Sequence, residues 1–296
     1  MDLSIIIVSY KCKEKLQVTL DAVFASRVDF DYEVLVVDNG SEDGTAEMIE
    51  EGYQNRLILI KNTNEGFSKA NNRGLKVSEG AYKLLLNPDT KVSTDTLQVM
   101  MDFMKSDHSA SQRIGIGTCK LVKEDGSIDP ACVRGLPNPA NTLLRFTGLS
   151  LLFPKSKFTT GYNLTALNFD EEIELGSCSG AFMFISPECF AKVGLLDEQF
   201  FMYGEDIDYC KRALDSGFKV WYYPKTSTVH YKGQSSRKNV SKTLYEFHKV
   251  MWLYYRKHLM SQYPFFFSWI VYIGIWSRYL LQLSKNVIRK EVYVSK

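Results

Sequence analysis

The chain has 296 residues, of which 45% are hydrophobic and 24% are charged. This composition is typical of a globular protein and excludes long disordered stretches, and the length fits one large domain with an appendage. The formal net charge is only +2, but the residues from Lys232 onward include 12 basic and 2 acidic side chains, against 24 and 32 before that point. A basic tail of this kind indicates contact with nucleic acid or with an anionic membrane surface.

The six cysteines lie far apart in the sequence, without a CxxC pair or a short Cys/His cluster of the zinc type. We therefore expect reduced thiols in a cytosolic setting. The first ten residues, MDLSIIIVSY, lack the charged lead and the cleavage site of a secretory signal, and they predict a buried strand instead. From these features we expect a protein body that is not exported across a membrane.

The first hundred residues alternate between short β-branched apolar runs and segments with helical spacing. Such alternation predicts a parallel sheet flanked by helices. We expect strands at residues 3–8, 34–37, 57–60 and 82–86, and helices at 14–24, 43–51, 65–77 and 93–105. The turn at residues 38–41 also offers an N-cap for the second of these helices. Ligands bind at the carboxyl ends of parallel strands, and the polar residues there are Ser9, Tyr10, Asp38, Asn87 and Asp89.

The pattern changes between residues 115 and 174, where Gly/Pro-containing segments such as RGLPNP predict long surface loops. Order returns at residues 176–186, a small-residue turn that leads into a strand, and at 205–216, a helix. In that helix Asp208 lies four residues before Arg212, a spacing typical of a surface ion pair.

Several sequence blocks, taken together, resemble a known family. The blocks are VVDNGSEDGT (36–45), NEGFSKANNRGL (64–75), LLLNPDT (84–90) and SGAFMFIS (179–186), and a long segment over residues 195–236 completes the series. Their order and separation resemble the family 2 inverting glycosyltransferases of the GT-A fold, and most of all the branch of rhamnosyltransferases. The resemblance spans residues 3–260. It implies an α/β fold with a Rossmann-like, mostly parallel sheet flanked by helices.

The resemblance also implies a nucleotide-sugar site at the strand ends. A nucleotide base needs an acceptor for its imide N–H and a flat surface beside it, which Asp38 and Tyr10 offer; the alternative for Asp38 is a helix-capping turn residue. Lys69 resembles a residue near the donor phosphates or ribose, and a solvated lysine is its alternative. The implied donor-binding residues are Ser9, Tyr10, Asp38, Gly66, Lys69, Asn72, Asn87 and Asp89.

A metal site is expected beside the donor diphosphate. This leaving group gains charge as the glycosidic bond breaks, and a divalent cation with oxygen ligands stabilises that charge. The family motif for such a cation is DxD, whereas this chain has Asn87-Pro88-Asp89 and lacks the first carboxylate. The resemblance assigns the metal to Asp89 and to His230, for which a buried, hydrogen-bonded histidine is the alternative. We expect Mg²⁺ or Mn²⁺, and an imidazole ligand favours Mn²⁺.

An inverting transfer also needs a base that takes the proton of the acceptor hydroxyl. Asp206 resembles the family base, and it opens a helix, where the helix dipole favours an ionised carboxylate. Glu205 is expected to orient the acceptor. Ser179 and Gly180 resemble the small-residue turn beneath the sugar, where the backbone can approach a ligand closely. The alternatives are an acidic helix N-terminus without a catalytic role and a purely structural tight turn.

The C-terminal tail combines aromatic and basic residues. Its uncharged run, residues 259–277, barely reaches the length of about 20 that crosses a bilayer. In a helix that starts at Pro264, one side would carry Trp269, Tyr272, Trp276 and Tyr279, and a basic stripe would carry Arg278, Gln282, Lys285 and Arg289. This pattern is typical of a helix in the headgroup region, so we expect residues 264–296 to bind an anionic membrane surface. A packing helix or a homodimer interface is the alternative, and nucleic acid is disfavoured because the aromatic residues would be exposed.

Together these observations predict a GT-A domain over residues 1–240 and a helical, membrane-associating extension over 241–296. The expected enzyme moves L-rhamnose from dTDP-L-rhamnose in a single displacement onto a polyprenyl-diphosphate-linked or growing cell-surface glycan, at the cytoplasmic face of the plasma membrane. A UDP-hexose transferase for galactose or glucose is the alternative of the same fold. A sugar-phosphate nucleotidyltransferase is disfavoured because the first strand ends in VSYKCKEK and not in a Gly-rich basic loop, and a non-catalytic glycan-binding scaffold stays open.

Overall fold

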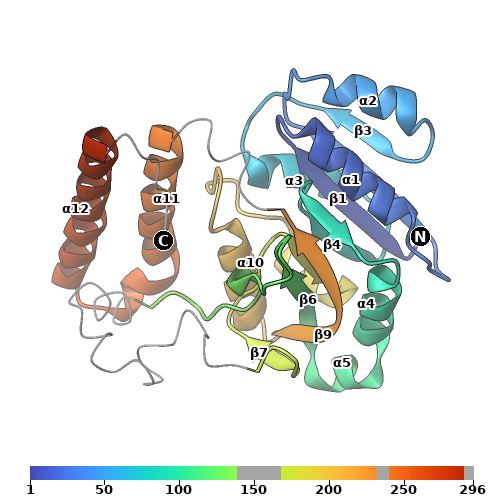
Figure 1. The fold of residues 1–296 in the computed structure, drawn as a ribbon. Coiled ribbons are helices and arrows are strands. Elements are labelled where there is room, and N and C mark those ends of the chain that lie inside the picture. Colours follow the sequence, from blue (N-terminus) through green and yellow to red (C-terminus); the bar gives the residue numbers. More distant parts are fainter. Residues whose placement is uncertain (139–167, 232–239, 290–296) are drawn as a thin grey trace.

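The computed structural model describes residues 1–138, 168–231 and 240–289, whose course is shown in Figure 1. The first half alternates between strands and helices, as the sequence predicts. Its elements are β1 (Leu3–Ser9), α1 (Lys13–Phe24), β2 (Tyr32–Asp38), α2 (Thr45–Gly52), β3 (Ile58–Lys61), α3 (Phe67–Val77), β4 (Tyr82–Leu86), β5 (Thr90–Val92), α4 (Thr96–Lys105) and α5 (Asp107–Gln112). Strands β3, β2, β1 and β4 are parallel neighbours, so the predicted parallel sheet is confirmed for this half.

The second half adds antiparallel strands and makes the sheet mixed. Its elements are β6 (Ile114–Val122), the short helix η1 (Pro130–Cys132), β7 (Ile173–Leu175), β8 (Phe182–Ile185), α9 (Pro187–Val193), α10 (Glu205–Asp215) and β9 (Lys219–His230). The strand order is β3-β2-β1-β4-β8-β6-β9-β5, with β7 beside β9. Strand β8 runs antiparallel to β4 and β6, whereas β6 and β9 are parallel.

Strand β6 occupies a stretch in which the sequence predicted long loops, so that prediction is wrong for residues 115–122. The strand is hard to recognise from the sequence because two glycines interrupt its apolar pattern. Packing requires both: a Cβ at Gly115 would lie 2.7 Å from Cβ of Phe218, and one at Gly117 would lie 2.7 Å from a methionine sulfur of α4. The part of the loop prediction that covers residues 139–167 lies outside the described residues.

Helix α2 begins at Thr45, two residues later than the sequence predicts, and the turn at residues 38–41 does not cap it. Gly44 stands at the N-cap with a left-handed backbone, φ 81°, and Asp43 accepts hydrogen bonds from the N–H and the hydroxyl of Thr45. Asp38 instead accepts a hydrogen bond from the N–H of Ser41, at 3.3 Å. The helix-capping alternative for Asp38 is therefore wrong.

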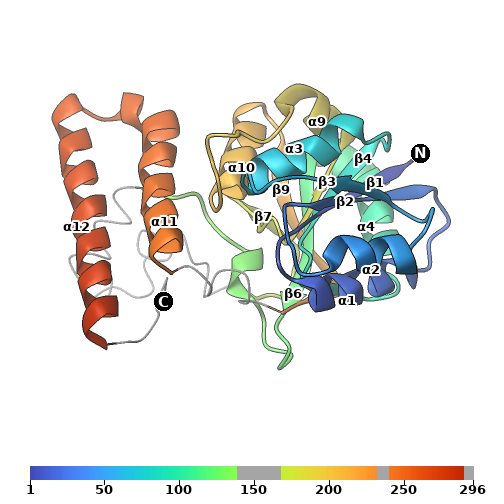
Figure 2. The ribbon, with the colours of Figure 1, turned by 90° about the horizontal axis from the view of Figure 1, so that it is seen from above.

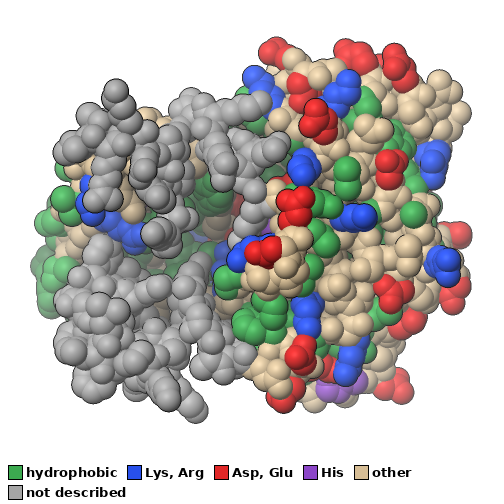
Figure 3. Space-filling view, viewed as in Figure 1, with side chains coloured by type: hydrophobic (Ala, Val, Ile, Leu, Met, Phe, Trp, Pro, Cys, Tyr) green, Lys and Arg blue, Asp and Glu red, His purple; other side chains and the backbone are tan. Residues whose placement is uncertain are grey.

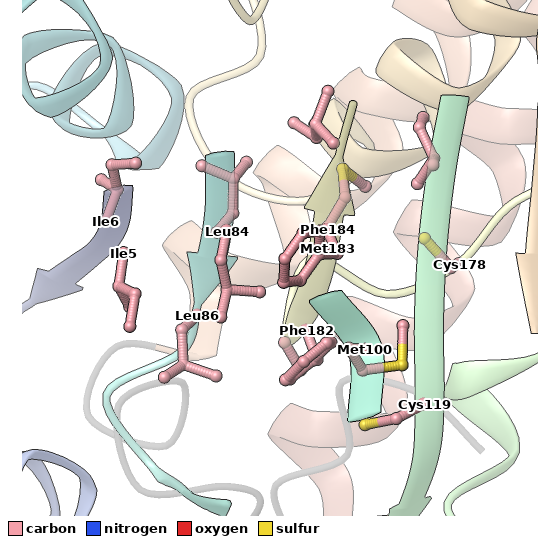
Figure 4. Packing of buried hydrophobic residues seen from close by; sticks show 14 of the residues in the cluster. Ile5, Ile6, Leu84, Leu86, Met100, Cys119, Cys178, Phe182, Met183 and Phe184 are labelled. Carbon is pink, nitrogen blue, oxygen red and sulfur yellow. The ribbon is translucent and has the colours of Figure 1, made fainter. Parts of the chain in front are cut away.

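The sheet is covered on both faces, which explains why its strands are continuous apolar runs. Figure 2 shows α3, α9 and α10 on one face and α1, α2 and α4 on the other. All seven residues of β1 are buried, and Figure 4 shows Leu84 and Leu86 of β4 beside Phe182 and Phe184 of β8 in the core. Because these strands are tightly packed, the polar residues at their ends have fixed positions.

The C-terminal part forms a helical hairpin beside the sheet domain (Figures 1 and 2). It consists of α11 (Val240–Tyr254), the π-helical turn η3 (Tyr255–Leu259), the short helix η4 (Met260–Gln262) and α12 (Phe265–Arg289). Three apolar residues of α11 pack against Phe200 and Ile207, so the hairpin contacts α10 and the segment before it. Within the described ranges, no helix combines the length and the apolar character that crossing a membrane requires.

The predicted aromatic stripe of α12 is not a fully exposed face, because most of its residues pack against α11. Tyr272 packs edge-on against a tryptophan of α11 with ring centroids 5.0 Å apart, and Trp276 and Tyr279 both contact Tyr245. Of the four, Trp269 is the most exposed, at 65%, and Tyr272 is still 41% exposed. The cause is that α11 offers aromatic partners in the edge-on geometry that such rings prefer. These aromatic contacts therefore hold the hairpin together, and α12 exposes a mixed aromatic and aliphatic face.

Candidate active site

The carboxyl ends of β1, β2 and β4 meet at one edge of the sheet. Ser9 and Asp38 are register partners at the ends of β1 and β2, and the N–H of Asn39 donates to the carbonyl of Ser9 at 2.8 Å. Asp38 is 7% exposed, so its carboxylate is largely shielded from solvent. The structure therefore brings Asp38 beside Ser9 and the adjoining Tyr10, where the sequence analysis expects the nucleotide base.

Three further predicted donor residues, Gly66, Lys69 and Asn72, lie on helix α3 or directly before it. Gly66 precedes it with φ 99°, and a Cβ there would lie 2.6 Å from a backbone carbonyl oxygen of the segment before α10, so only glycine fits. Asn72 is buried, and its amide exchanges two hydrogen bonds of 2.9 Å with the backbone of Leu196. Its polar atoms thus fasten a neighbouring loop to α3, and a donor contact from Asn72 stays a prediction. A donor contact from Lys69, which is half-buried, also stays a prediction.

The antiparallel pairing of β5 with β9 places His230 next to the motif Asn87-Pro88-Asp89. Nε2 of His230 lies 3.4 Å from Oδ1 of Asp89, and Nδ1 lies 3.0 Å from Oδ2 of Asp129. His230 is only 7% exposed. Burial lowers the pKa of the imidazole, but the hydrogen bonds with Asp129 and Asp89 outweigh burial and raise the pKa to about 9.

This arrangement fits a divalent cation that displaces the proton from Nε2 of His230, because a ligating imidazole is neutral. Asp89 and His230 supply a carboxylate and an imidazole, and Asp129 contacts the far ring nitrogen, as the residues that orient metal-binding histidines do. No group of three or more His, Cys, Asp or Glu side chains that could hold a metal occurs in the described part of the chain. Further ligands would come from the donor diphosphate and water, as is common for Mg²⁺ at phosphate sites. Sequence reasoning misses Asp129 because its surroundings, GSIDP, indicate a plain turn.

Helix α10 begins at a sharp turn that directs its first carboxylates. Tyr203 and Gly204 both have left-handed backbones, with φ 68° and 76°. This conformation is strained for a tyrosine, and at Gly204 a Cβ would lie 2.4 Å from Cγ1 of Val250 in α11. Because this turn packs against the hairpin, the hairpin and α10 together fix the directions of Glu205 and Asp206.

Asp206, the predicted base, is held by three hydrogen-bond donors. Its Oδ2 accepts from the guanidinium of Arg134 at 2.5 Å and from the N–H of Gly180 at 3.2 Å, and its Oδ1 accepts from the N–H of Ile207 at 2.8 Å. The residue is 9% exposed. Sequence reasoning misses Arg134 because it stands in the RGLPNP segment, which carries no catalytic motif.

The turn at residues 179–181 connects this base to the metal motif. On one side Gly180 donates to Asp206, and on the other side the carbonyl of Ala181 accepts from the N–H of Asn87 at 3.1 Å. The turn leads into β8, which pairs with β4. One short turn therefore bonds both the predicted base and the first residue of the predicted metal motif.

Glu205 has an unusual environment for a carboxyl group. It is 7% exposed, and its Oε2 has no hydrogen-bond partner within the ranges that the structure describes. Burial, and then the nearby carboxylate of Asp206, raise the pKa of Glu205 to about 8. A carboxyl group with this pKa is largely protonated at neutral pH, so it can donate a hydrogen bond to a substrate oxygen.

The prediction of a surface ion pair for Asp208 is wrong. Asp208 does contact Nε of Arg212, at 2.9 Å, but its side chain is fully buried and also bonds Nζ of Lys257 at 2.6 Å and Nε2 of His258 at 2.7 Å. Burial raises the pKa of Asp208, but the hydrogen bonds from His258 and Lys257 outweigh burial and hold the pKa below its usual value. Two residues after Asp206, α10 is thereby tied to the π-helical turn of the hairpin.

The sequence matches glycosyl transferase family 2 over residues 4–167, and the chain belongs to this family. It is 27% identical over 232 residues to an N-acetylglucosaminyl-diphospho-decaprenol L-rhamnosyltransferase of Mycobacterium tuberculosis, an alignment that covers 75% of this chain and 73% of that protein. It is 26% identical over 245 residues to the rhamnosyltransferase WbbL of Escherichia coli, with 80% of this chain and 86% of that protein covered. The predicted likeness to rhamnosyltransferases is confirmed by both relatives.

The fold is shared with solved glycosyltransferases. The mannosyltransferase PcManGT of Pyrobaculum calidifontis, in complex with GDP-Man and Mn²⁺, superimposes with a TM-score of 0.59 at 15% identity, covering 93% of this chain and 69% of that chain. At this identity the likeness shows the fold alone. The predicted GT-A fold, with helices after the sheet domain, is confirmed.

Proposed function

We propose that the chain is an inverting glycosyltransferase that moves L-rhamnose from dTDP-L-rhamnose onto a polyprenyl-diphosphate-linked or growing cell-surface glycan. Both relatives are named as rhamnosyltransferases, and the M. tuberculosis protein is named for a diphospho-decaprenol acceptor. The observation that carries the proposal is the turn at residues 179–181, which bonds Asp206 on one side and Asn87 on the other. This contact of one turn with both groups supports a reaction in which the base and the leaving group act on the same sugar.

In this reaction the acceptor oxygen attacks the anomeric carbon, and its proton moves to Asp206 as the new C–O bond forms. The bond between the anomeric carbon and the diphosphate oxygen breaks on the far side, so the configuration inverts and the electron pair stays on the diphosphate. A Mg²⁺ or Mn²⁺ ion bound by Asp89 and His230 would stabilise that charge. Glu205 donates a hydrogen bond that orients the acceptor, and the small turn at Ser179 lets the sugar approach the backbone.

On the donor side, Asp38 accepts the imide N–H of the base and Tyr10 supplies a flat surface. Thymine and uracil carry the same imide N–H, so a contact with Asp38 alone does not distinguish dTDP from UDP. A UDP-galactose or UDP-glucose transferase therefore stays the alternative. Contacts from Gly66, Lys69 and Asn72 to the phosphates or ribose remain part of the proposal.

Donor turnover tests the proposal. The full chain with Mn²⁺ is given dTDP-L-rhamnose, UDP-glucose or UDP-galactose, and nucleotide release is measured. We expect dTDP-L-rhamnose to be turned over fastest and Asp206→Asn to lower this rate by roughly 10²- to 10⁴-fold. The control is Asp215→Asn, which removes a surface carboxylate of the same helix. Turnover of a UDP-hexose alone would favour the alternative donor, and nucleotide binding without turnover would favour a glycan-binding scaffold.

We also propose that residues 241–296 hold the domain of residues 1–240 on the anionic cytoplasmic face of the plasma membrane as a peripheral protein. Among the described residues, fourteen large apolar side chains are exposed, and eight lie on α12: Phe265, Phe266, Trp269, Ile270, Tyr272, Ile273, Leu280 and Leu281. Helix α12 contains no acidic residue and is about 37 Å long. Figure 3 shows apolar side chains along the outer edge of the hairpin with basic ones beside them. A helix with this surface suits the headgroup region.

Vesicle flotation tests the membrane proposal. Ile270→Glu combined with Ile273→Glu places two charges on the exposed face of α12, whereas Val77→Glu changes an apolar side chain of similar exposure on α3. We expect the double variant to lose binding to vesicles that contain anionic lipid and the control to keep it. If the wild-type chain does not float and light scattering shows a dimer that the double variant lacks, a second copy of the chain covers this face instead.

A further inference from the structure

Arg134 lies at the junction of three segments. Its backbone forms an isolated β-bridge with Ser177, and its guanidinium donates to the carbonyl of Cys178 at 2.9 Å and to Oδ2 of Asp206 at 2.5 Å. The side chains of Arg134 and Asp206 are 16% and 12% exposed. The ion pair is therefore largely shielded from water, and its geometry is not averaged by solvent as that of a surface pair is.

A shielded ion pair contributes little net stability, because the desolvation of two charges offsets their attraction. Its effect is on direction, since the rigid guanidinium fixes the plane of the carboxylate that it contacts. A carboxylate has about four positions for hydrogen-bond donors. Arg134, Gly180 and Ile207 take three of them on Asp206. Among the residues that the structure describes, no other donor takes the fourth position, which is open to an incoming hydroxyl group.

We propose that Arg134 is a positioning residue for the transfer step: it turns the carboxylate of Asp206 so that its remaining acceptor position faces the acceptor hydroxyl. The same guanidinium bonds Cys178, so it also holds the start of the turn at residues 179–181 against the base. This inference rests on the proposed function, because it takes Asp206 as the base. Arg134 acts through Asp206 and not on the donor nucleotide.

The test compares Arg134→Met, Arg134→Lys, Asp206→Asn and the double variant Arg134→Met/Asp206→Asn in the full chain. The measurements are kcat and KM for nucleotide release from dTDP-L-rhamnose with Mn²⁺, and the affinity for dTDP by calorimetry. The control is Lys211→Met, which removes another ion pair of α10, that with Asp215. Melting temperatures confirm that each variant is folded, and Arg134→Lys, which keeps the charge, is the second probe if Arg134→Met unfolds.

We expect Arg134→Met to lower kcat by roughly 10²-fold, because a displacement of the base by about 1 Å lowers the rate of the transfer step by that factor. KM and dTDP affinity should stay within about threefold of wild type, since the residue acts on the transfer step. Arg134→Lys should recover part of kcat, because an ammonium keeps the charge without the planar fork. The double variant should be no slower than Asp206→Asn alone, as for two residues that act as a unit.

Four outcomes would overturn the inference. Additive losses in the double variant, or a fall in dTDP affinity that matches the fall in kcat, would make Arg134 a structural residue. A slow Asp206→Asn beside a fast Arg134→Met would overturn the inference and leave the proposed function intact. A wild-type rate in Asp206→Asn would overturn the base assignment itself, and the inference with it.

Discussion

Replacement of Glu205 by glutamine should stabilise the fold, and the gain should grow with pH. Burial and the neighbouring Asp206 raise the pKa of Glu205 from 4.5 to about 8. The folded state therefore binds this proton more tightly than the unfolded state, so the free energy of unfolding falls as the pH rises through this interval and the full penalty is present above pH 8. At about 1.4 kcal/mol for each pKa unit, the penalty is on the order of 5 kcal/mol.

Urea unfolding of the wild-type chain and of Glu205→Gln, between about pH 5 and about pH 9, measures this penalty. The difference in free energy of unfolding should be small at the acid end and should widen toward the alkaline end, because only the wild type has to bury a charge there. Glu188→Gln, which changes an exposed carboxylate of α9, is the control and should show no such trend. A difference that stays constant within about 0.5 kcal/mol across this range would refute the reasoning.

Three further perturbations probe the metal site, the donor loop and the hairpin. Asp129→Asn should weaken Mn²⁺ binding by about 10- to 100-fold, because it removes the carboxylate that orients His230; electron paramagnetic resonance of the unbound ion measures this, and unchanged affinity would contradict the orienting role. Gly66→Ala should cost about 2 kcal/mol of stability or more from the left-handed backbone and the clash before α10, and wild-type urea midpoints would exclude that clash. Asp208→Asn should cost about 3–5 kcal/mol and expose the hairpin to limited proteolysis, whereas an unchanged cleavage pattern would show that Asp208 does not hold it.

The strand ends that carry the proposed donor residues could be predicted because the signal for a strand is local in the sequence. A buried parallel strand is recognisable from a few β-branched residues, and the polar residues that follow it must lie at the carboxyl edge of the sheet. Asp38 and Asp89 occupy such positions, and the structure confirms where their strands end. His230 needed more than local pattern, because only the pairing of β5 with β9 brings it beside Asp89.

The parts that could not be predicted depend on contacts between distant segments. Asp129 and Arg134 stand in a stretch without a motif, and their roles come from pairing with His230 and with Asp206. For α12, helical periodicity tells which side chains share a face, but it does not tell which face meets α11. The aromatic side, which includes Trp276, turned out to be the packed one.

Helix α10 is held by both the sheet domain and the hairpin, and these two sets of contacts determine the position of Asp206, the proposed base. Its first turn carries Asp206, which the sheet domain holds through Arg134 and Gly180. The same helix carries Asp208, which the hairpin holds through Lys257 and His258. Because residues on a helix move together, a displacement of the hairpin would displace the base, and about 1 Å is enough to cost roughly 10²-fold in rate. The position of Asp206, the proposed base, therefore depends on the hairpin as well as on the sheet domain, so a surface that fixes the hairpin would also fix Asp206.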